Sequence, residues 1–93
     1  MDIKNGIYAV KFGAEWCAPC KTVNAQLEKM KVEFDSVTFL FIDIDDEPEL
    51  AKEYKISSIP TVILFKDGEV VDRFSGAVKT EPMRKKFKEL VAA

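Results

Sequence analysis

Two cysteines three positions apart are the residues in this sequence with the clearest chemical potential. Cys17 and Cys20 are the only cysteines among the 93 residues, and they are flanked by Trp16 and Lys21. A thiolate is the nucleophile in thiol–disulfide exchange, and a second thiol can resolve the mixed disulfide that the first thiol forms. The spacing therefore predicts thiol–disulfide exchange.

The expected position of the pair explains how one thiol is activated. The apolar run 7–12 is typical of a buried strand, and apolar residues recur at helical spacing over about Pro19–Phe34. Cys17 is therefore expected near the helix N-cap, where unpaired N–H groups and the helix dipole favour a thiolate. Thiols in such motifs have pKa values of about 3.5–7.5, compared with about 8.5 when free. Cys17 is predicted to be the exposed attacking thiol, and Cys20 the shielded resolving thiol.

Two other roles are open to a cysteine pair. A structural disulfide across three positions closes a very small loop and so restrains the unfolded chain little. A zinc site needs about four ligands, whereas this chain offers two thiols and no histidine. A zinc or iron–sulfur site would have to be shared between two chains, so no metal is expected in the chain itself. Exchange is favoured because the pair follows a strand and opens a helix.

Length and charge limit the classes of protein. A chain of 93 residues supplies one core, so residues 1–93 are predicted to form a single domain. The net charge of −2 gives no bias toward nucleic acid or an anionic membrane. No apolar run approaches the roughly 18 residues that span a bilayer, and the first residues lack the pattern of a secretory signal. We expect a monomeric, cytoplasmic protein that binds neither nucleic acid nor membranes.

The remaining patterns predict the order of the elements. Further strands are expected at 37–44, 61–65 and 69–74, a short helix over about 46–54, and a last helix from about Thr80. Asp-Gly between the last two strands is typical of a tight hairpin turn. The order β-α-β-α-β-β-α indicates crossover helices between parallel strands, followed by an antiparallel hairpin. The sequence therefore predicts an α/β fold, a four-stranded mixed sheet flanked by helices.

Four segments together resemble the thioredoxin family. They are Ala14–Lys21 around the cysteines, Ile59-Pro60-Thr61 before the third strand, Phe65–Gly68 at the hairpin, and Ser75-Gly76-Ala77 after the last strand. The resemblance runs from about residue 7 to the C-terminus, and the order and spacing of all four segments match. It implies a thioredoxin-like fold that lacks the usual first strand and helix, because only Met1–Gly6 precede the first predicted strand.

The resemblance also implies an activity. The chain would be a protein-disulfide reductase in which Cys17 attacks and Cys20 resolves, with no cofactor beyond its own redox-active disulfide. Its partners would be disulfide-containing proteins and a recharging enzyme of the thioredoxin-reductase type. The alternative is a thioredoxin-like binding or chaperone module in which the redox state of the cysteines is a regulatory trait.

The site implied by the resemblance lies around the sulfurs. The peptide bond before Pro60 would be cis and lie beside them, and the backbone of Ile59 would pair with an extended substrate segment. Apolar residues around the sulfurs would form a small docking surface, which suits transient association with many partners. These residues are Trp16, Ala18, Pro19, Ile59, Gly76 and Ala77.

Several positions near the cysteines depart from the family pattern. Lys11 stands where the family normally has a buried acidic residue, and Phe41 stands where the family has a partner lysine. Gly13 replaces a bulky aromatic residue and leaves more space beneath the active-site loop. The residue after Cys17 is Ala18 rather than glycine, for which we expect only a modest change in reduction potential.

Two roles are open to Lys11. Its side chain could extend to the end of the sheet and keep its ammonium in water. Alternatively, a partly buried ammonium near Cys20 would stabilise the thiolate of that residue. Asp43 or Asp45, on the neighbouring strand, would then supply the counter-charge.

Overall fold

Strands and helices alternate in the order that the apolar pattern predicts. The computed structural model describes residues 1–92. The predicted elements are confirmed, and the bounds differ by one or two residues, as is usual for element ends. The elements are β1 (Ile7–Gly13), α1 (Ala18–Glu33), β2 (Val37–Asp43), α2 (Pro48–Glu53), β3 (Thr61–Lys66), β4 (Glu69–Ser75) and α3 (Thr80–Ala92). None of the described helices is long and apolar enough to cross a membrane.

The four strands form one mixed sheet in the order β2-β1-β3-β4. β1 and β2 are parallel, so they need a long crossover, which the 16-residue α1 provides. β3 is antiparallel to both β1 and β4. β1 and β3 are therefore paired on both sides and largely buried, whereas β2 and β4 lie at the edges and are partly exposed. This arrangement explains the nearly continuous apolar character of the two central strands.

The β3–β4 hairpin turns at Asp67-Gly68, as the sequence predicts. Both residues have positive φ angles, 51° and 88°, which glycine adopts readily and aspartate tolerates. The carboxylate of Asp67 also accepts a hydrogen bond of 3.0 Å from the backbone N–H of Gly6. The segment before β1 is thereby attached to the hairpin.

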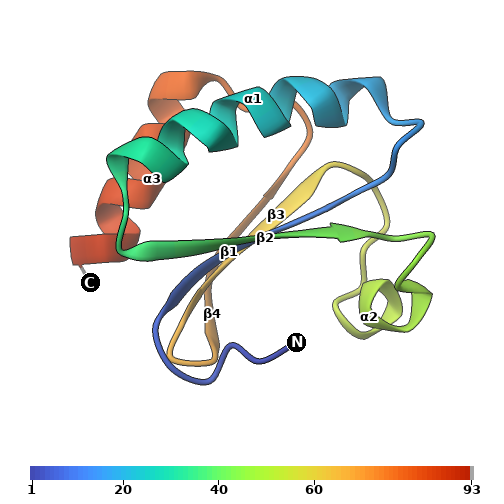
Figure 1. Cartoon of the computed structure of the whole chain (residues 1–93), viewed down its shortest axis with the longest axis horizontal. Helices are drawn as coiled ribbons and strands as arrows, with labels where there is room; N and C mark the ends of the chain where they lie inside the picture. Colours follow the sequence, from blue (N-terminus) through green and yellow to red (C-terminus); the bar gives the residue numbers. More distant parts are fainter. Residues whose placement is uncertain (93) are drawn as a thin grey trace.

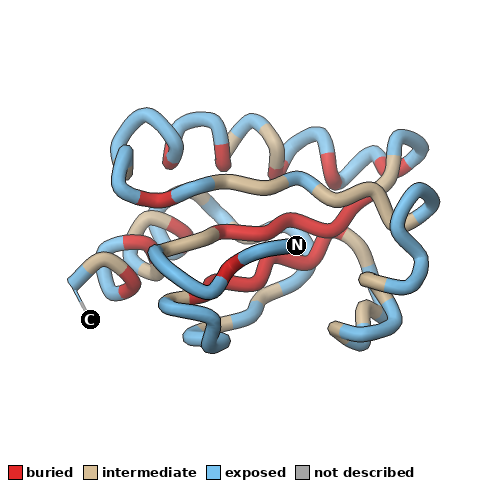
Figure 2. The backbone as a smooth tube through the Cα atoms, turned by 60° about the horizontal axis from the view of Figure 1, so that its bottom comes forward, coloured by how far each residue is buried: buried red, intermediate tan, exposed pale blue. Residues whose placement is uncertain are grey.

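Helices cover both faces of the sheet. α1 and α3 lie on one face and α2 on the other (Figure 1). Buried residues run along the central strands and recur on the inward sides of α1 and α3 (Figure 2). The larger cluster combines Ala9, Val37, Val62 and Leu64 of the sheet with Val23, Leu27 and Met30 of α1 and Met83, Phe87 and Leu90 of α3. The smaller one combines Val10, Phe12, Ile63 and Phe65 with Ile3, and Leu50 and Tyr54 pack against it.

Phe87 joins α3 to the rest of the larger cluster. Its ring is fully buried and stacks on Phe34 at the end of α1 and on Phe39 of β2, with centroid distances of 5.6 Å and 5.4 Å. Aromatic pairs at such distances contribute beyond the area that they bury. Together with Met83 and Leu90, Phe87 therefore packs the last helix against the sheet.

We predict that Phe87→Ala lowers the free energy of unfolding by about 3–5 kcal/mol, because it leaves a cavity among two aromatic rings. Urea denaturation measures the loss. Val32→Ala on α1 is the matched control, because Val32 is 84% exposed and its truncation should change stability by no more than about 0.5 kcal/mol. Similar losses in the two variants would contradict this account of the core.

Candidate active site at the start of helix α1

The cysteine pair lies where β1 leaves the centre of the sheet and α1 begins. Cys17 is the N-cap residue of α1, and its Sγ accepts a hydrogen bond of 3.2 Å from the backbone N–H of Cys20. The predicted N-cap position is confirmed. Pro19 occupies the first turn, where its missing N–H leaves no helical hydrogen bond unmade. Cys17 and Cys20 form a disulfide, so this is the oxidised form of the pair.

The predicted exposure of Cys17 is wrong for this oxidised form. Cys17 is only 5% exposed and Cys20 is 1% exposed, so both are buried. The reason is that the capping hydrogen bond and the disulfide both direct the Cys17 sulfur back over the start of α1. Cys17 remains the more accessible of the two, but the oxidised pair presents little sulfur surface to solvent.

The loop before β3 has the backbone form that the family resemblance implies. The Ile59-Pro60 peptide bond is cis, and Pro60 is buried. The carbonyl of Pro60 accepts a hydrogen bond of 2.9 Å from the N–H of Gly76. Gly76 has a φ of +78° and no atom within 4 Å of an added Cβ. The structure thus brings the proline loop and the loop after β4 together, and the backbone at Gly76 stays open.

An apolar hollow lies between the cysteine loop and the proline loop. Its volume is about 160 Å³, and it is lined by Trp16, Ile44, Ile56, Ser57, Ser58 and Ile59. Trp16 is 69% exposed, and its indole N–H donates a 2.8 Å hydrogen bond to Asp45. The predicted surface residues Ala18, Pro19, Gly76 and Ala77 are exposed. Asp45 therefore orients Trp16, and of the two carboxylates predicted as a counter-charge for Lys11, Asp43 is the one that acts on the pKa of Lys11.

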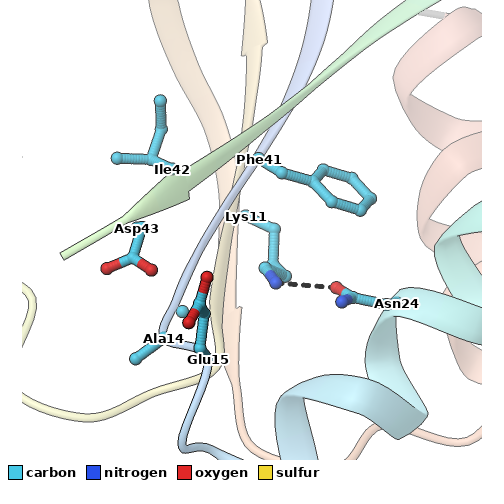
Figure 3. Close-up of a pocket in the computed structure, with 8 residues that line it drawn as sticks. Lys11, Ala14, Glu15, Asn24, Phe41, Ile42 and Asp43 are labelled. Atoms are coloured by element: carbon cyan, nitrogen blue, oxygen red, sulfur yellow. Dashed lines mark hydrogen bonds between the residues drawn. The ribbon is translucent and has the colours of Figure 1, made fainter. Parts of the chain in front are cut away.

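Lys11 is buried beside the cysteine helix. Only 6% of the residue is exposed, so the expectation that its ammonium reaches water at the end of the sheet is wrong. Its Nζ donates a hydrogen bond of 2.7 Å to Oδ1 of Asn24 on α1 and lies 5.0 Å from the ring centroid of Phe41 (Figure 3). Sequence reasoning missed Asn24, although its place four residues after Cys20 puts the two on one helix face.

Gly13 makes room for the head group of Lys11. A Cβ at this position would lie 2.9 Å from Nζ of Lys11 and 3.0 Å from Sγ of Cys20. Real Cβ contacts are not this short, so a larger residue would displace one of these groups. The ammonium and the resolving sulfur therefore border the same small space, and the room predicted at Gly13 is occupied by lysine.

The environment of Lys11 opposes its charge. Burial lowers the pKa of the ammonium from 10.5, and the charge of Asp43 acts in the opposite direction. Asp43 lines a cavity of about 200 Å³ that Lys11 and Glu15 also line. Within residues 1–92, Lys11 belongs to none of the ion pairs. Asp43 is thus a counter-charge at a distance, not a contact partner.

Fold and site together define a class of protein. A mixed sheet delivers two cysteines to the N-terminus of a helix, and they form a disulfide there. Across residues 1–92, no three histidine, cysteine or acidic residues are grouped to hold a metal ion. A dithiol–disulfide couple at a helix N-terminus supports thiol–disulfide exchange. The site is that of a thiol–disulfide oxidoreductase.

Comparison with known proteins identifies the family within this class. Residues 2–89 match the thioredoxin family model. Thioredoxin of Chlamydia trachomatis serovar D is 49% identical over 75 residues, which cover 81% of this chain and 74% of that protein. The chain belongs to the thioredoxin family, as the resemblance predicts, and is a protein-disulfide oxidoreductase.

Solved structures confirm the thioredoxin-like fold. Oxidised mitochondrial thioredoxin 3 of Saccharomyces cerevisiae superimposes with a TM-score of 0.85 at 33% identity, covering 94% of this chain and 81% of that chain. A second structure concerns the thiol resolving mechanism in yeast mitochondrial 1-Cys peroxiredoxin via the glutathione and thioredoxin systems. It matches with a TM-score of 0.86 at 32% identity and the same coverage.

Replacing Lys11 by methionine should stabilise the oxidised protein. We expect Lys11→Met to raise the free energy of unfolding at pH 7 by about 1 kcal/mol, because an apolar side chain of similar length replaces a buried charge. The cost of the charge disappears as the pH rises through the lowered pKa of Lys11 toward 10.5, so the advantage should shrink over that range. Urea denaturation of the oxidised proteins at several pH values measures it. If the stability advantage of Lys11→Met stays constant across this pH range, the explanation by a buried charge is contradicted. Lys21→Met, which changes an exposed lysine, is the control.

Gly13→Ala should destabilise the protein by about 1–3 kcal/mol, because the added methyl group overpacks the space beside Lys11 and Cys20. In a Lys11→Ala background the same change should cost less, since the closest neighbour of the methyl group has gone. A double-mutant cycle read by urea denaturation should give a coupling of at least about 0.5 kcal/mol. Additive losses would show that the two residues do not compete for the same space.

Proposed function

We propose that this chain is a general dithiol reductase that reduces disulfides in other proteins. Cys17 is the attacking thiol, Cys20 the resolving thiol, and the only redox group is their own disulfide. The observation that carries the proposal is the position of Cys17 as the N-cap of α1, with its sulfur 3.2 Å from the backbone nitrogen of Cys20. A hydrogen bond from this N–H to a thiolate, together with the helix dipole, lowers the pKa of the attacking thiol.

The reaction proceeds in two exchanges. The Cys17 thiolate attacks one sulfur of a substrate disulfide, forms a mixed disulfide and releases the other substrate sulfur as a thiolate. Cys20 then loses its proton and attacks the Cys17 sulfur, so that the Cys17–Cys20 bond forms and the second substrate sulfur leaves. The Cα–Cα distance of 5.3 Å in the oxidised pair is ordinary for a disulfide, so the product of the second exchange fits this site.

The substrate surface of the proposal surrounds the two loops at the sulfurs. Trp16 and Ile59 line the apolar hollow, and Gly76 is hydrogen-bonded to the Pro60 carbonyl. An extended substrate segment would pair with the backbone of Ile59 while its side chains contact the exposed residues nearby, which are Trp16, Ala18, Pro19, Gly76 and Ala77. A hollow of this size supports weak, transient contacts with many proteins.

The partners of the proposal follow from the electron balance. Each reduced substrate leaves this chain as a disulfide, so a thioredoxin-reductase-type enzyme must return two electrons to it. Such a cycle operates in a reducing compartment, and we assign the chain to the cytoplasm as a monomer. Two of the similar solved structures are of yeast mitochondrial proteins. Fractionation of the cells that express this chain therefore tests the assignment to the cytoplasm.

Reduction of insulin in the presence of dithiothreitol tests the proposal. The chain should accelerate precipitation of the insulin B chain well above the rate with dithiothreitol alone. Cys17→Ser should return the rate to that background, because the attacking sulfur is gone. Cys20→Ser should also lose turnover but should accumulate a mixed disulfide on Cys17, visible by mass spectrometry without reductant.

Two outcomes would count against this function. A wild-type chain that leaves the background rate unchanged is no reductase. Full biological function in Cys17→Ser, despite lost reduction of insulin, would favour the binding or chaperone module. Lys21→Met serves as the control, because it changes an exposed residue of the same helix turn and should keep the wild-type rate.

A further inference from the structure

We propose that the buried ammonium of Lys11 stabilises the Cys20 thiolate in the resolving exchange, and that Gly13 exists to admit it. The inference rests on the proposed reductase function, since only the resolving step requires a Cys20 thiolate. Lys11 thus acts through Cys20: it stabilises negative charge on the Cys20 sulfur and does not touch the substrate.

The first support is proximity. A carbon atom added at Gly13 would lie 2.9 Å from Nζ of Lys11 and 3.0 Å from Sγ of Cys20. The cation and the sulfur therefore border one space that is too small for a methyl group. Both belong to the buried interior, since Lys11 is 6% exposed and Cys20 is 1% exposed. A positive charge beside a thiol favours its thiolate form.

The second support is the way in which the head group is held. An ammonium has three N–H donors, and among residues 1–92 its one hydrogen bond goes to Asn24. The ring of Phe41 lies 5.0 Å away and offers its face to the cation. Neither contact neutralises the charge, so the remaining donors can turn to a thiolate beside Gly13. Figure 3 shows Asn24 and Phe41 on the same side of Lys11, whose side chain points toward the cysteine helix.

The charged groups around this space are few. The loop before α1 contributes Glu15, and β2 contributes Asp43, both of which line the cavity beside Lys11. α1 contributes the neutral Asn24, and β3 contributes Val62, the register partner of Lys11. The two carboxylates lie on the far side of Lys11 from Asn24 (Figure 3). Of the two, Asp43 favours the charged form of Lys11 and so opposes the effect of burial on its pKa.

The chemical step is balanced without a basic side chain. In the mixed disulfide, the Cys20 thiol releases its proton to solvent, and the ammonium of Lys11 stabilises the thiolate that remains. The thiolate attacks Cys17 Sγ, the Cys17–Cys20 bond forms, and the bond between Cys17 and the substrate sulfur breaks. The substrate sulfur leaves as a thiolate and takes a proton from solvent. Lys11 keeps its own proton throughout.

The first experiment measures the pKa of Cys20 directly. In Cys17→Ser protein, Cys20 is the only thiol, and its thiolate absorbance can be followed against pH. Adding Lys11→Gln removes the charge but retains a donor for Asn24. We expect the pKa of Cys20 to rise by about one unit, a tenfold loss of thiolate below that pKa. Lys21→Met, which removes an exposed charge one residue from Cys20, should leave the titration unchanged.

A second variant keeps the test decisive if Lys11→Gln folds poorly. Asn24→Asp leaves the lysine in place and sets a carboxylate against its ammonium, at the position of the 2.7 Å hydrogen bond. The field at the sulfur should weaken, and the pKa of Cys20 should again rise. A Cys20 pKa that is unchanged in either folded variant overturns the inference, because a purely structural role for Lys11 leaves the titration where it is.

The resolving step itself supplies the second readout. A chromogenic aromatic thiol is placed on Cys17 as a mixed disulfide, and its release by Cys20 is followed by absorbance. In Lys11→Gln the release at pH 7 should slow by about threefold, because fewer thiolates form but each is more nucleophilic. The midpoint of the pH profile should move up with the Cys20 pKa. An unmoved midpoint contradicts the inference.

The two proposals fail in different ways. If the wild-type chain does not reduce insulin, the reductase function fails, yet the Cys20 titration in Cys17→Ser protein still reports on Lys11. If the wild-type chain reduces insulin and Lys11→Gln leaves the Cys20 pKa unchanged, the reductase function stands and the electrostatic role of Lys11 is refuted.

Discussion

The pairing of β1 on both of its edges is the constraint on which the rest of this structure depends. β2 and β3 hold the strand along its length, and this fixes where the strand ends at Gly13 and where α1 begins. Cys17 then caps the helix within a few residues of a rigid strand. The same pairing keeps Lys11 at the centre of the sheet, where its side chain has no edge to reach. The reactive pair and the buried cation are two consequences of one central strand.

The site combines features that act on the two sulfurs separately. The backbone N–H of Cys20 at the start of α1 donates to the Cys17 sulfur, whereas the side chain of Lys11 borders the space beside Cys20. The Cys17 sulfur is contacted by the backbone of the helix, and the Cys20 sulfur lies near a side chain of the sheet. Because Gly13 lies at the junction of these two elements, its lack of a side chain decides how closely the cation approaches the sulfur.

Local patterns were sufficient for the elements and for the position of the cysteine pair at the start of α1. Apolar periodicity, the Asp-Gly turn and the strand that precedes the C-x-x-C pair predict features formed by residues close in sequence. The failures involve contacts between distant segments. The carboxylate of Asp45 accepts a hydrogen bond from the Trp16 indole N–H, and the side chain of Asn24 accepts one from Lys11. No spacing rule specifies which of several nearby polar groups a side chain will meet, because packing decides it.

By itself, the sequence determined that this chain is a four-stranded α/β protein with a redox-active cysteine pair at a helix N-terminus. Those properties depend on periodicity, capping and spacing, which are local. Only the tertiary structure decided that Lys11 is buried, that its ammonium shares the space at Gly13 with Cys20, and that oxidised Cys17 is covered. The reason is that burial and electrostatic partners depend on how strand, helix and loop pack together. Where a side chain can point in two directions, the local sequence does not specify which one it takes.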